Sequence, residues 1–192
     1  MNPSPQNYAR LALLVLVTVI LQVSGVASLQ LFGASPDLVP VLVGAVAFFC
    51  GSVPGAVTGF VAGLLLDVTI GPELGASSLV LVGVGYMTGR FRELRDPGHG
   101  LVPVAVAVAA SLGYGLGVAA VALLLAVEAP VSALVVRDGL LTVALNALLA
   151  LPMFALVRRL LRPAIAHDPF ARRRRPADPL TTGPIGLRGL DV

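Results

Sequence analysis

Glycine recurs at every fourth position through one apolar stretch of the chain, and the single interruption is a carboxylate. The series consists of Gly51, Gly55, Gly59, Gly63, Asp67, Gly71 and Gly75. Fourfold spacing places successive residues on nearly one face of an α-helix. In a soluble helix each glycine would cost about 1 kcal/mol, but in a bilayer small residues let two helix backbones approach closely. The row therefore predicts a membrane helix that packs through its glycines, either against the second and fourth spans of the same chain or against a partner's helix.

The composition also indicates a membrane protein. Hydrophobic residues make up 57% of the 192 residues and charged residues 12%, whereas soluble domains contain about 25% charged residues. Apolar segments alternate with short polar breaks, so we predict an all-α, polytopic fold of six transmembrane helices. The expected spans cover 11–31, 37–50, 55–70 after a turn at 51–54, 74–91, 101–127 and 139–157, with residue 130 as an alternative start of the sixth. The second span is shorter than the roughly 17–25 residues that a crossing helix needs.

These spans divide the chain into a short N-terminal segment (1–10), a membrane domain (11–162) and an Arg-rich tail (163–192) that we expect to be disordered. All thirteen basic residues are arginine, and with six spans only Arg137 falls on the second side of the membrane. The positive-inside rule then predicts cytoplasmic N- and C-termini. One alternative is that the first apolar stretch is a signal peptide cleaved near 25–27, which would leave five spans and an outside N-terminus.

Three residues with a carboxylate or amide side chain lie well inside the predicted spans, namely Asp67, Gln22 and Asn146, and Gln30 lies near the end of the first span. Asp67 lies about one turn from the C-terminal end of its helix, where the helix macrodipole does not favour a carboxylate. We expect it to pair with a buried group or a partner helix, or to reach headgroup water; a proton relay is less favoured because no second carboxylate or histidine shares the membrane interior. The amides of Gln22 and Asn146 predict hydrogen bonds between helices, with ligand contact as the alternative.

The sequence contains no phosphate-binding loop, no metal-ligand spacing and no serine or cysteine set against a histidine. We therefore expect neither an enzyme nor a cofactor. The arginines flank the membrane, which favours contact with the lipid bilayer over nucleic-acid binding.

A set of short motifs runs along residues 35–92, and a looser set follows it toward the C-terminus. The motifs are Pro36-Asp37, the GAVTGF stretch from Gly55 to Phe60, the GLLLD stretch from Gly63 to Asp67, Gly71-Pro72, Leu74-Gly75, Gly85-Tyr86, Gly89-Arg90, Leu145-Asn146-Ala147, Pro152 and Arg158-Arg159. Together they resemble the bacterial rod shape-determining protein MreD family over roughly residues 11–162.

The resemblance implies a non-enzymatic, multi-pass subunit of the cell-wall elongation machinery in the bacterial inner membrane. Such a subunit binds MreC and, through it, associates with RodA, its partner transpeptidase and MreB, and it helps to maintain rod shape during peptidoglycan synthesis. The family is also similar to the six-helix substrate-binding subunits of energy-coupling-factor vitamin transporters, which supplies an alternative function. That alternative needs an outer cavity lined by polar or aromatic groups, and the sequence offers no tryptophan and few polar residues for one.

Overall fold

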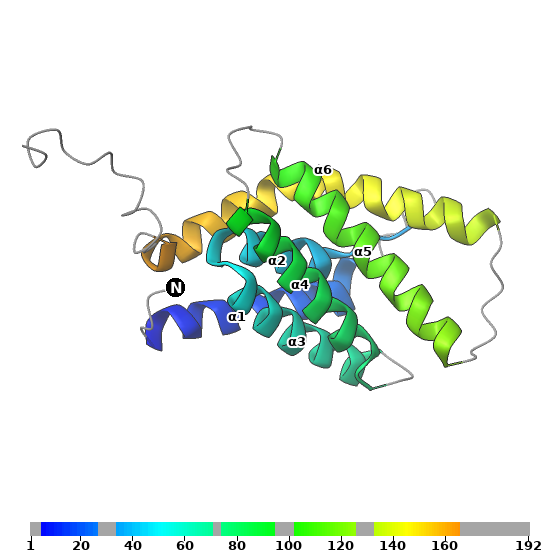
Figure 1. The fold of residues 1–192 in the computed structure, drawn as a ribbon, viewed down its shortest axis with the longest axis horizontal. Helices are drawn as coiled ribbons and strands as arrows, with labels where there is room; N and C mark the ends of the chain where they lie inside the picture. Colours follow the sequence, from blue (N-terminus) through cyan, green and yellow to red (C-terminus); the bar gives the residue numbers. More distant parts are fainter. Residues whose placement is uncertain (1–4, 27–33, 71–73, 95–101, 126–132, 166–192) are drawn as a thin grey trace, which may run out of the picture.

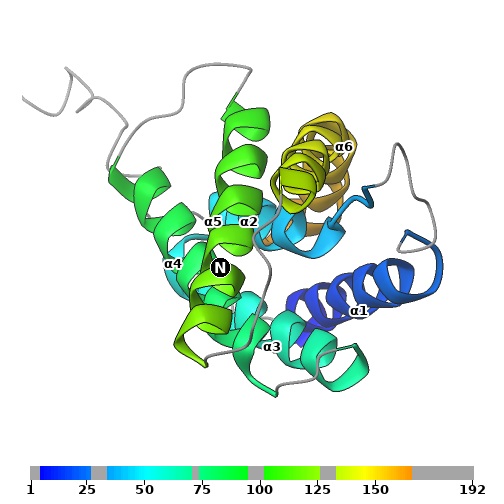
Figure 2. The same ribbon diagram turned by 90° about the vertical axis from the view of Figure 1, so that its right-hand side faces the viewer.

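The computed structural model describes residues 5–26, 34–70, 74–94, 102–125 and 133–165. These ranges form six α-helices and one π-helical turn: α1 (Pro5–Leu21), η1 (Gln22–Val26), α2 (Leu38–Cys50), α3 (Ser52–Thr69), α4 (Ala76–Leu94), α5 (Val102–Leu124) and α6 (Ala133–Ile165). Figures 1 and 2 show the helices as one bundle with α2 inside it. We name the two ends of the bundle after the turns they contain: α3 and α4 meet at the α3–α4 end, and α2 and α3 meet at the α2–α3 end.

The short helix α2 is the centre of the bundle and contacts α1, α3, α4, α5 and α6. Each of its residues from Leu38 to Ala47 is buried. Its 13 residues span about 20 Å, less than the roughly 30 Å hydrocarbon thickness of a bilayer. The other helices enclose α2, so it does not have to reach both membrane surfaces.

The two ends of α2 follow from local chemistry. Pro40 lies in the first turn of the helix. Backbone N–H groups there have no partner within the helix, so the missing N–H of a proline breaks no helical hydrogen bond. The helix ends at Gly51, whose φ of 101° is accessible to glycine without strain. The chain then enters α3 directly at Ser52, so the turn expected over 51–54 is limited to Gly51, whose positive φ reverses the chain in one residue.

Four of the described helical segments are long and apolar enough to cross a membrane: Pro5–Ser24, Ser52–Thr69, Val102–Leu124 and Val135–Leu161. Helix α2 is too short for this criterion, and α4 carries Arg90, Arg92 and Glu93 near its end. An all-helical, multi-pass membrane protein is thus supported. Crossing of the bilayer by α2 and α4 remains a prediction from the sequence.

Helix boundaries differ from the expected spans mainly at the chain ends. Helix α1 begins at Pro5, because proline suits the first helical position. Helix α6 was expected over 139–157, or from residue 130, and runs from Ala133 to Ile165, about 50 Å. The prediction counted only apolar residues, whereas the charged residues Arg137, Asp138, Arg158 and Arg159 continue the helix at both ends. Residues 166–192 of the expected tail lie outside the described residues, as does position 27 of the proposed cleavage region at 25–27, whose first two positions belong to η1.

Candidate functional site

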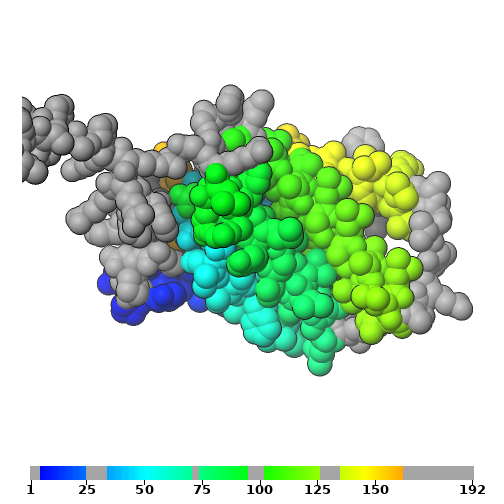
Figure 3. Space-filling model, in the orientation of Figure 1, coloured from blue at the N-terminus to red at the C-terminus, as the bar shows by residue number. Residues whose placement is uncertain are grey.

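The glycines of α3 lie against the backbone of α4. A Cβ atom added to Gly55, Gly59 or Gly63 would come within 3.0 Å of main-chain atoms of α4, a distance that real Cβ atoms do not reach. The α4 residues that supply these atoms are Gly85, Leu81 and Ser78, respectively. In the space-filling view α3 and α4 form one continuous surface (Figure 3). Close backbone approach of this kind stabilises membrane helix pairs through van der Waals contact.

Helix α4 contributes glycines of its own to this contact. Gly85 lies against Gly55, and Gly89 lies against Ser52. The remaining members of the row have other positions: Gly51 and Gly75 are turn residues with φ near +100°, and Gly71 lies outside the described residues. The α3 face of the row is therefore covered by a helix of the same chain.

Asp67 caps the beginning of α4. Its side chain is buried, with 2% of its surface exposed. Its Oδ2 accepts hydrogen bonds from the backbone N–H of Gly75 (2.9 Å) and Ser78 (3.1 Å), and its Oδ1 accepts from the N–H of Ser77 (3.1 Å). The hydroxyl of Ser78 adds a bond to Oδ2 at 3.3 Å. The macrodipole of α3 disfavours this carboxylate, as expected, but the positive N-terminus of α4 and its free N–H groups stabilise it.

A second carboxylate, Glu93, performs the same task at the opposite end of the pair. Its Oε1 accepts bonds from the backbone N–H (3.0 Å) and the hydroxyl (2.8 Å) of Ser52, the first residue of α3. Arg90 donates to its other oxygen at 3.4 Å. Each helix of this antiparallel pair thus carries near its end a carboxylate that caps the start of the other. The sequence analysis missed Glu93; the available signal was a carboxylate near the end of both helices of one hairpin.

Gln22 and Asn146 meet at the start of α2. The N–H of Leu38 donates to Oε1 of Gln22 (2.8 Å), and the N–H of Asp37 donates to Oδ1 of Asn146 (2.9 Å). The amide of Gln22 also donates to Oδ1 of Asp37 (2.9 Å), and that of Asn146 donates to the hydroxyl of Ser111 (2.8 Å). Two side chains from η1 and α6 therefore satisfy backbone N–H groups of a helix that begins inside the bundle, where water does not satisfy them.

The other end of α2 is held by Arg92 of α4. Its Nη1 donates to the carbonyl oxygen of Phe49 (2.8 Å), one of the last carbonyls of α2. Its guanidinium carbon lies 5.8 Å from the ring centroid of Phe48, within the range of a cation–π interaction. A cation at the C-terminus of a helix also complements the macrodipole.

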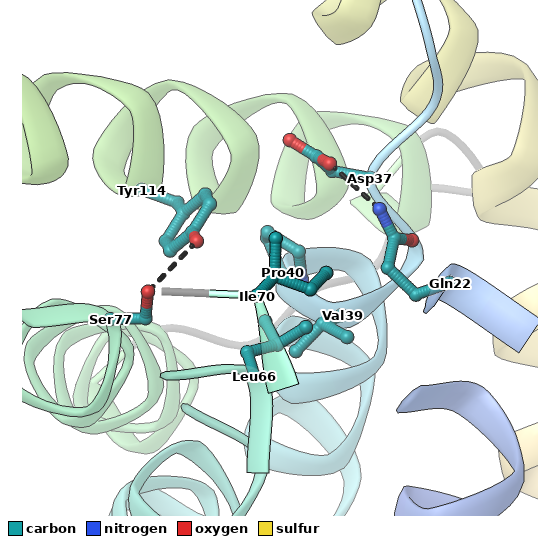
Figure 4. Close-up of a pocket in the computed structure, with 8 residues that line it drawn as sticks. All are labelled: Gln22, Asp37, Val39, Pro40, Leu66, Ile70, Ser77 and Tyr114. Atoms are coloured by element: carbon teal, nitrogen blue, oxygen red, sulfur yellow. Dashed lines mark hydrogen bonds between the residues drawn. The ribbon is translucent and has the colours of Figure 1, made fainter. Parts of the chain in front are cut away.

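A half-open cavity of about 270 Å³ lies at the α3–α4 end, beside the start of α2. Four polar side chains and four apolar ones line it: Gln22, Asp37, Ser77 and Tyr114, with Val39, Pro40, Leu66 and Ile70 (Figure 4). The hydroxyl of Tyr114 donates to that of Ser77 at 3.3 Å (Figure 4). The lining contains one carboxylate, Asp37, and no basic side chain. Such a cavity favours a hydrogen-bond donor or a cation. The sequence analysis did not predict that Asp37, Ser77 and Tyr114 would line a cavity.

Residues 7–163 match the family model of the rod shape-determining protein MreD. The chain belongs to the MreD family. Membership implies a role in rod-shape determination and, as is general in this family, a non-catalytic membrane component. No curated protein and no solved structure matched the chain. Within the described ranges, no three His, Cys, Asp or Glu side chains are placed to hold a metal ion.

In this MreD-family chain, we expect substitution of Asn146 to lower the stability at the start of α2, because its side chain is fully buried. Asn146→Leu removes the acceptor of the Asp37 N–H and leaves the Ser111 hydroxyl without its donor. Leaving a buried donor unsatisfied costs about 1–3 kcal/mol, so we expect a lower melting temperature of the purified protein in detergent. Ser111→Ala, which keeps the bond to Asp37, should cause a smaller loss. A wild-type melting temperature for Asn146→Leu would contradict this capping role.

Proposed function

We propose that this chain is a non-enzymatic scaffold of the cell-wall elongation complex that binds MreC in the bacterial inner membrane. Through MreC it associates with RodA, its transpeptidase and MreB, and so maintains rod shape during peptidoglycan synthesis. Beyond family membership, the observation that supports this proposal is the cavity at the α3–α4 end. Small-molecule pockets generally have volumes of about 300–1,000 Å³ and enclose most of the ligand. This cavity of about 270 Å³ lies at the lower limit of that range and is open on one side, which fits one or two side chains of a docked protein segment.

The proposed orientation places this cavity on the outer side of the membrane. Among the residues whose side chains the structure describes, the helix segments at the α2–α3 end carry Arg10, Arg90, Arg92, Arg158 and Arg159, whereas Arg137 lies toward the other end next to Asp138 (Figure 1). By the positive-inside rule the α2–α3 end, and with it both termini, is cytoplasmic. The cavity is then open to the part of a partner that leaves the membrane on the outer side.

The glycine row has a supporting role in this proposal. Since α4 covers Gly55, Gly59 and Gly63, we assign these residues to the packing of the hairpin and not to the seating of a partner's helix. The hairpin carries Leu66 and Ser77 to the cavity wall. Partner contact therefore belongs to the cavity, with Asp37 as its charged group.

Asp37→Asn tests this assignment with little disturbance of the fold, because an amide oxygen can still accept from Gln22. We expect MreC recovery in a mild-detergent pull-down of the tagged chain, measured by quantitative mass spectrometry, to fall about tenfold. Loss of one charge-assisted hydrogen bond of roughly 1.5 kcal/mol accounts for that change. Asp138→Asn, the same change outside the cavity, should keep wild-type recovery. Wild-type recovery with Asp37→Asn at an unchanged melting temperature would rule out the cavity as the docking site.

The alternative function, a substrate-binding subunit of an energy-coupling-factor vitamin transporter, draws support from the polar and aromatic lining of the same cavity. The pull-down distinguishes the two functions directly. A scaffold brings down MreC with elongation enzymes, and a transporter subunit brings down a transmembrane coupling protein with paired ATPases. The open side of the cavity, which would leave a small molecule partly uncovered, favours the first outcome.

A further inference from the structure

Exposed arginines gather at the end of the bundle opposite the cavity. Arg158 and Arg159 are exposed near the end of α6, and Arg10 is exposed in the first half of α1. Helices α1 and α6 contact each other, and Figure 1 shows the start of α1 and the end of α6 at the same end of the molecule. Two helices in contact thus carry three exposed arginines at the same end of the bundle.

These arginines differ from those of α4, which have partners inside the protein. Arg90 pairs with Glu93 and Arg92 donates to Phe49, and Glu93 is further bonded to Ser52. Within the described residues of α1 there is no acidic side chain, and the acidic side chain of described α6 is Asp138, about 30 Å from Arg158 along the helix. The two helices therefore supply no carboxylate near Arg10, Arg158 and Arg159.

Apolar side chains continue the same surfaces toward the middle of the bundle. Leu156, three residues before Arg159 on α6, and Leu13, three residues after Arg10 on α1, are exposed, and residues at this spacing lie on the same side of a helix. Tyr8, of the type that favours the membrane–water interface, is also exposed at this end of α1. A surface with guanidinium groups at the interface and leucines below it matches the two parts of a phospholipid. A free phosphate ion or an acidic protein segment would use the arginines but not the leucines.

We propose that Arg158 and Arg159, together with Arg10, bind the headgroup phosphate of an anionic phospholipid whose acyl chains lie along the exposed leucines of α6 and α1. Guanidinium groups bind phosphate oxygens through paired, charge-assisted hydrogen bonds. The lipid supplies the counter-charge that α1 and α6 lack at this end. This proposal does not depend on the identity of the protein partner.

Native mass spectrometry of the full chain, purified in mild detergent, tests the proposal. Phosphatidylglycerol and phosphatidylcholine with the same acyl chains are added separately, and the bound fractions give a preference ratio. We expect the wild type to prefer phosphatidylglycerol. The ratio should fall at least tenfold in the R158Q/R159Q variant, because an arginine near an anionic surface contributes about fivefold. Arg137→Gln, at the other end of α6, should leave the ratio unchanged.

Several results would overturn the proposal. They are an equal affinity of the wild type for the two lipids, an unchanged ratio in R158Q/R159Q, or an equal fall with Arg137→Gln. If inorganic phosphate raises the melting temperature as much as phosphatidylglycerol does, the site takes free phosphate and not a lipid. Arg10→Gln, on a different helix, gives an independent answer should the double variant misfold: a reduced ratio supports the site, and an unchanged ratio contradicts it.

Discussion

Gly85→Ala is expected to destabilise the protein strongly, whereas Gly83→Ala, two residues away on the same helix, is expected to stabilise it. A Cβ atom at Gly85 would overlap main-chain atoms of Gly55, which cannot move unless α3 and α4 separate. At Gly83 no heavy atom lies within 4 Å of the added Cβ. Helix propensity alone favours alanine by up to about 1 kcal/mol at both positions. Opposite changes in stability for the two variants would therefore be caused by packing and not by helix propensity. Overpacking should lower the stability of Gly85→Ala by about 1–3 kcal/mol.

Thermal unfolding of the two purified variants in the same detergent measures this difference. Gly59→Ala, on the facing helix, should behave like Gly85→Ala because its Cβ would meet the backbone of Leu81. Given the family's role in rod-shape determination, cells that carry Gly85→Ala as the only copy should lose rod shape while Gly83→Ala cells keep it. Equal melting temperatures for Gly83→Ala and Gly85→Ala would contradict the close approach of α3 and α4.

The sequence could predict this packing only in part. The fourfold spacing of glycine specifies a smooth helix face, and hydropathy specifies the membrane setting, so the helical class and the close packing follow from residues alone. For the partner of this face the sequence left two alternatives, the second and fourth spans of the same chain or a partner's helix, because a smooth surface can accept any helix of complementary shape. Gly85 and Gly89, four residues apart on α4, match the row on α3, but this pairing is seen only when both helices are placed.

Polar residues inside the bundle show the same limit. Asn146 and Gln22 were expected to bond across helices or to contact a ligand, and the structure places them on backbone N–H groups at the start of α2. Those N–H groups need side-chain partners because α2 begins inside the bundle. The depth at which α2 begins depends on tertiary packing, which the sequence pattern does not contain.

The cavity was missed for a related reason, since its lining comes from η1, α2, α3, α4 and α5 and from the segment that precedes α2.

Reasoning from one helix at a time also limited the interpretation of Asp67. A carboxylate near the C-terminus of its own helix is electrostatically unfavourable, which suggested a partner but did not identify it. The N-terminus of α4 provides that partner through a turn of the same chain. An antiparallel hairpin places the end of one helix beside the start of the next, so a carboxylate in this position is a recognisable capping signal once the hairpin is considered as a unit.

Asp67→Ala is therefore expected to be among the most damaging single substitutions in this chain. It leaves the N–H groups of Gly75, Ser77 and Ser78 without their acceptor at a buried site. Each unsatisfied buried group costs about 1–3 kcal/mol, so we expect a loss of several kcal/mol, seen as a large fall in melting temperature and in the yield of folded protein. Asp138→Ala, which removes a carboxylate from the first turns of α6, should change stability by no more than about 0.5 kcal/mol.

Whether Asp67→Ala loses folding stability or MreC binding distinguishes a capping role from a partner-binding role for Asp67. If the carboxylate acts only as a cap, the surviving folded fraction of Asp67→Ala should recover MreC in proportion to its amount. A variant that keeps the wild-type melting temperature but recovers no MreC would show that Asp67 acts on the partner, and the capping assignment would be wrong. Glu93→Ala provides the matched comparison at the other end of the hairpin: it removes the acceptor of the Ser52 N–H but is more exposed, so its loss of stability should be smaller and in the same direction.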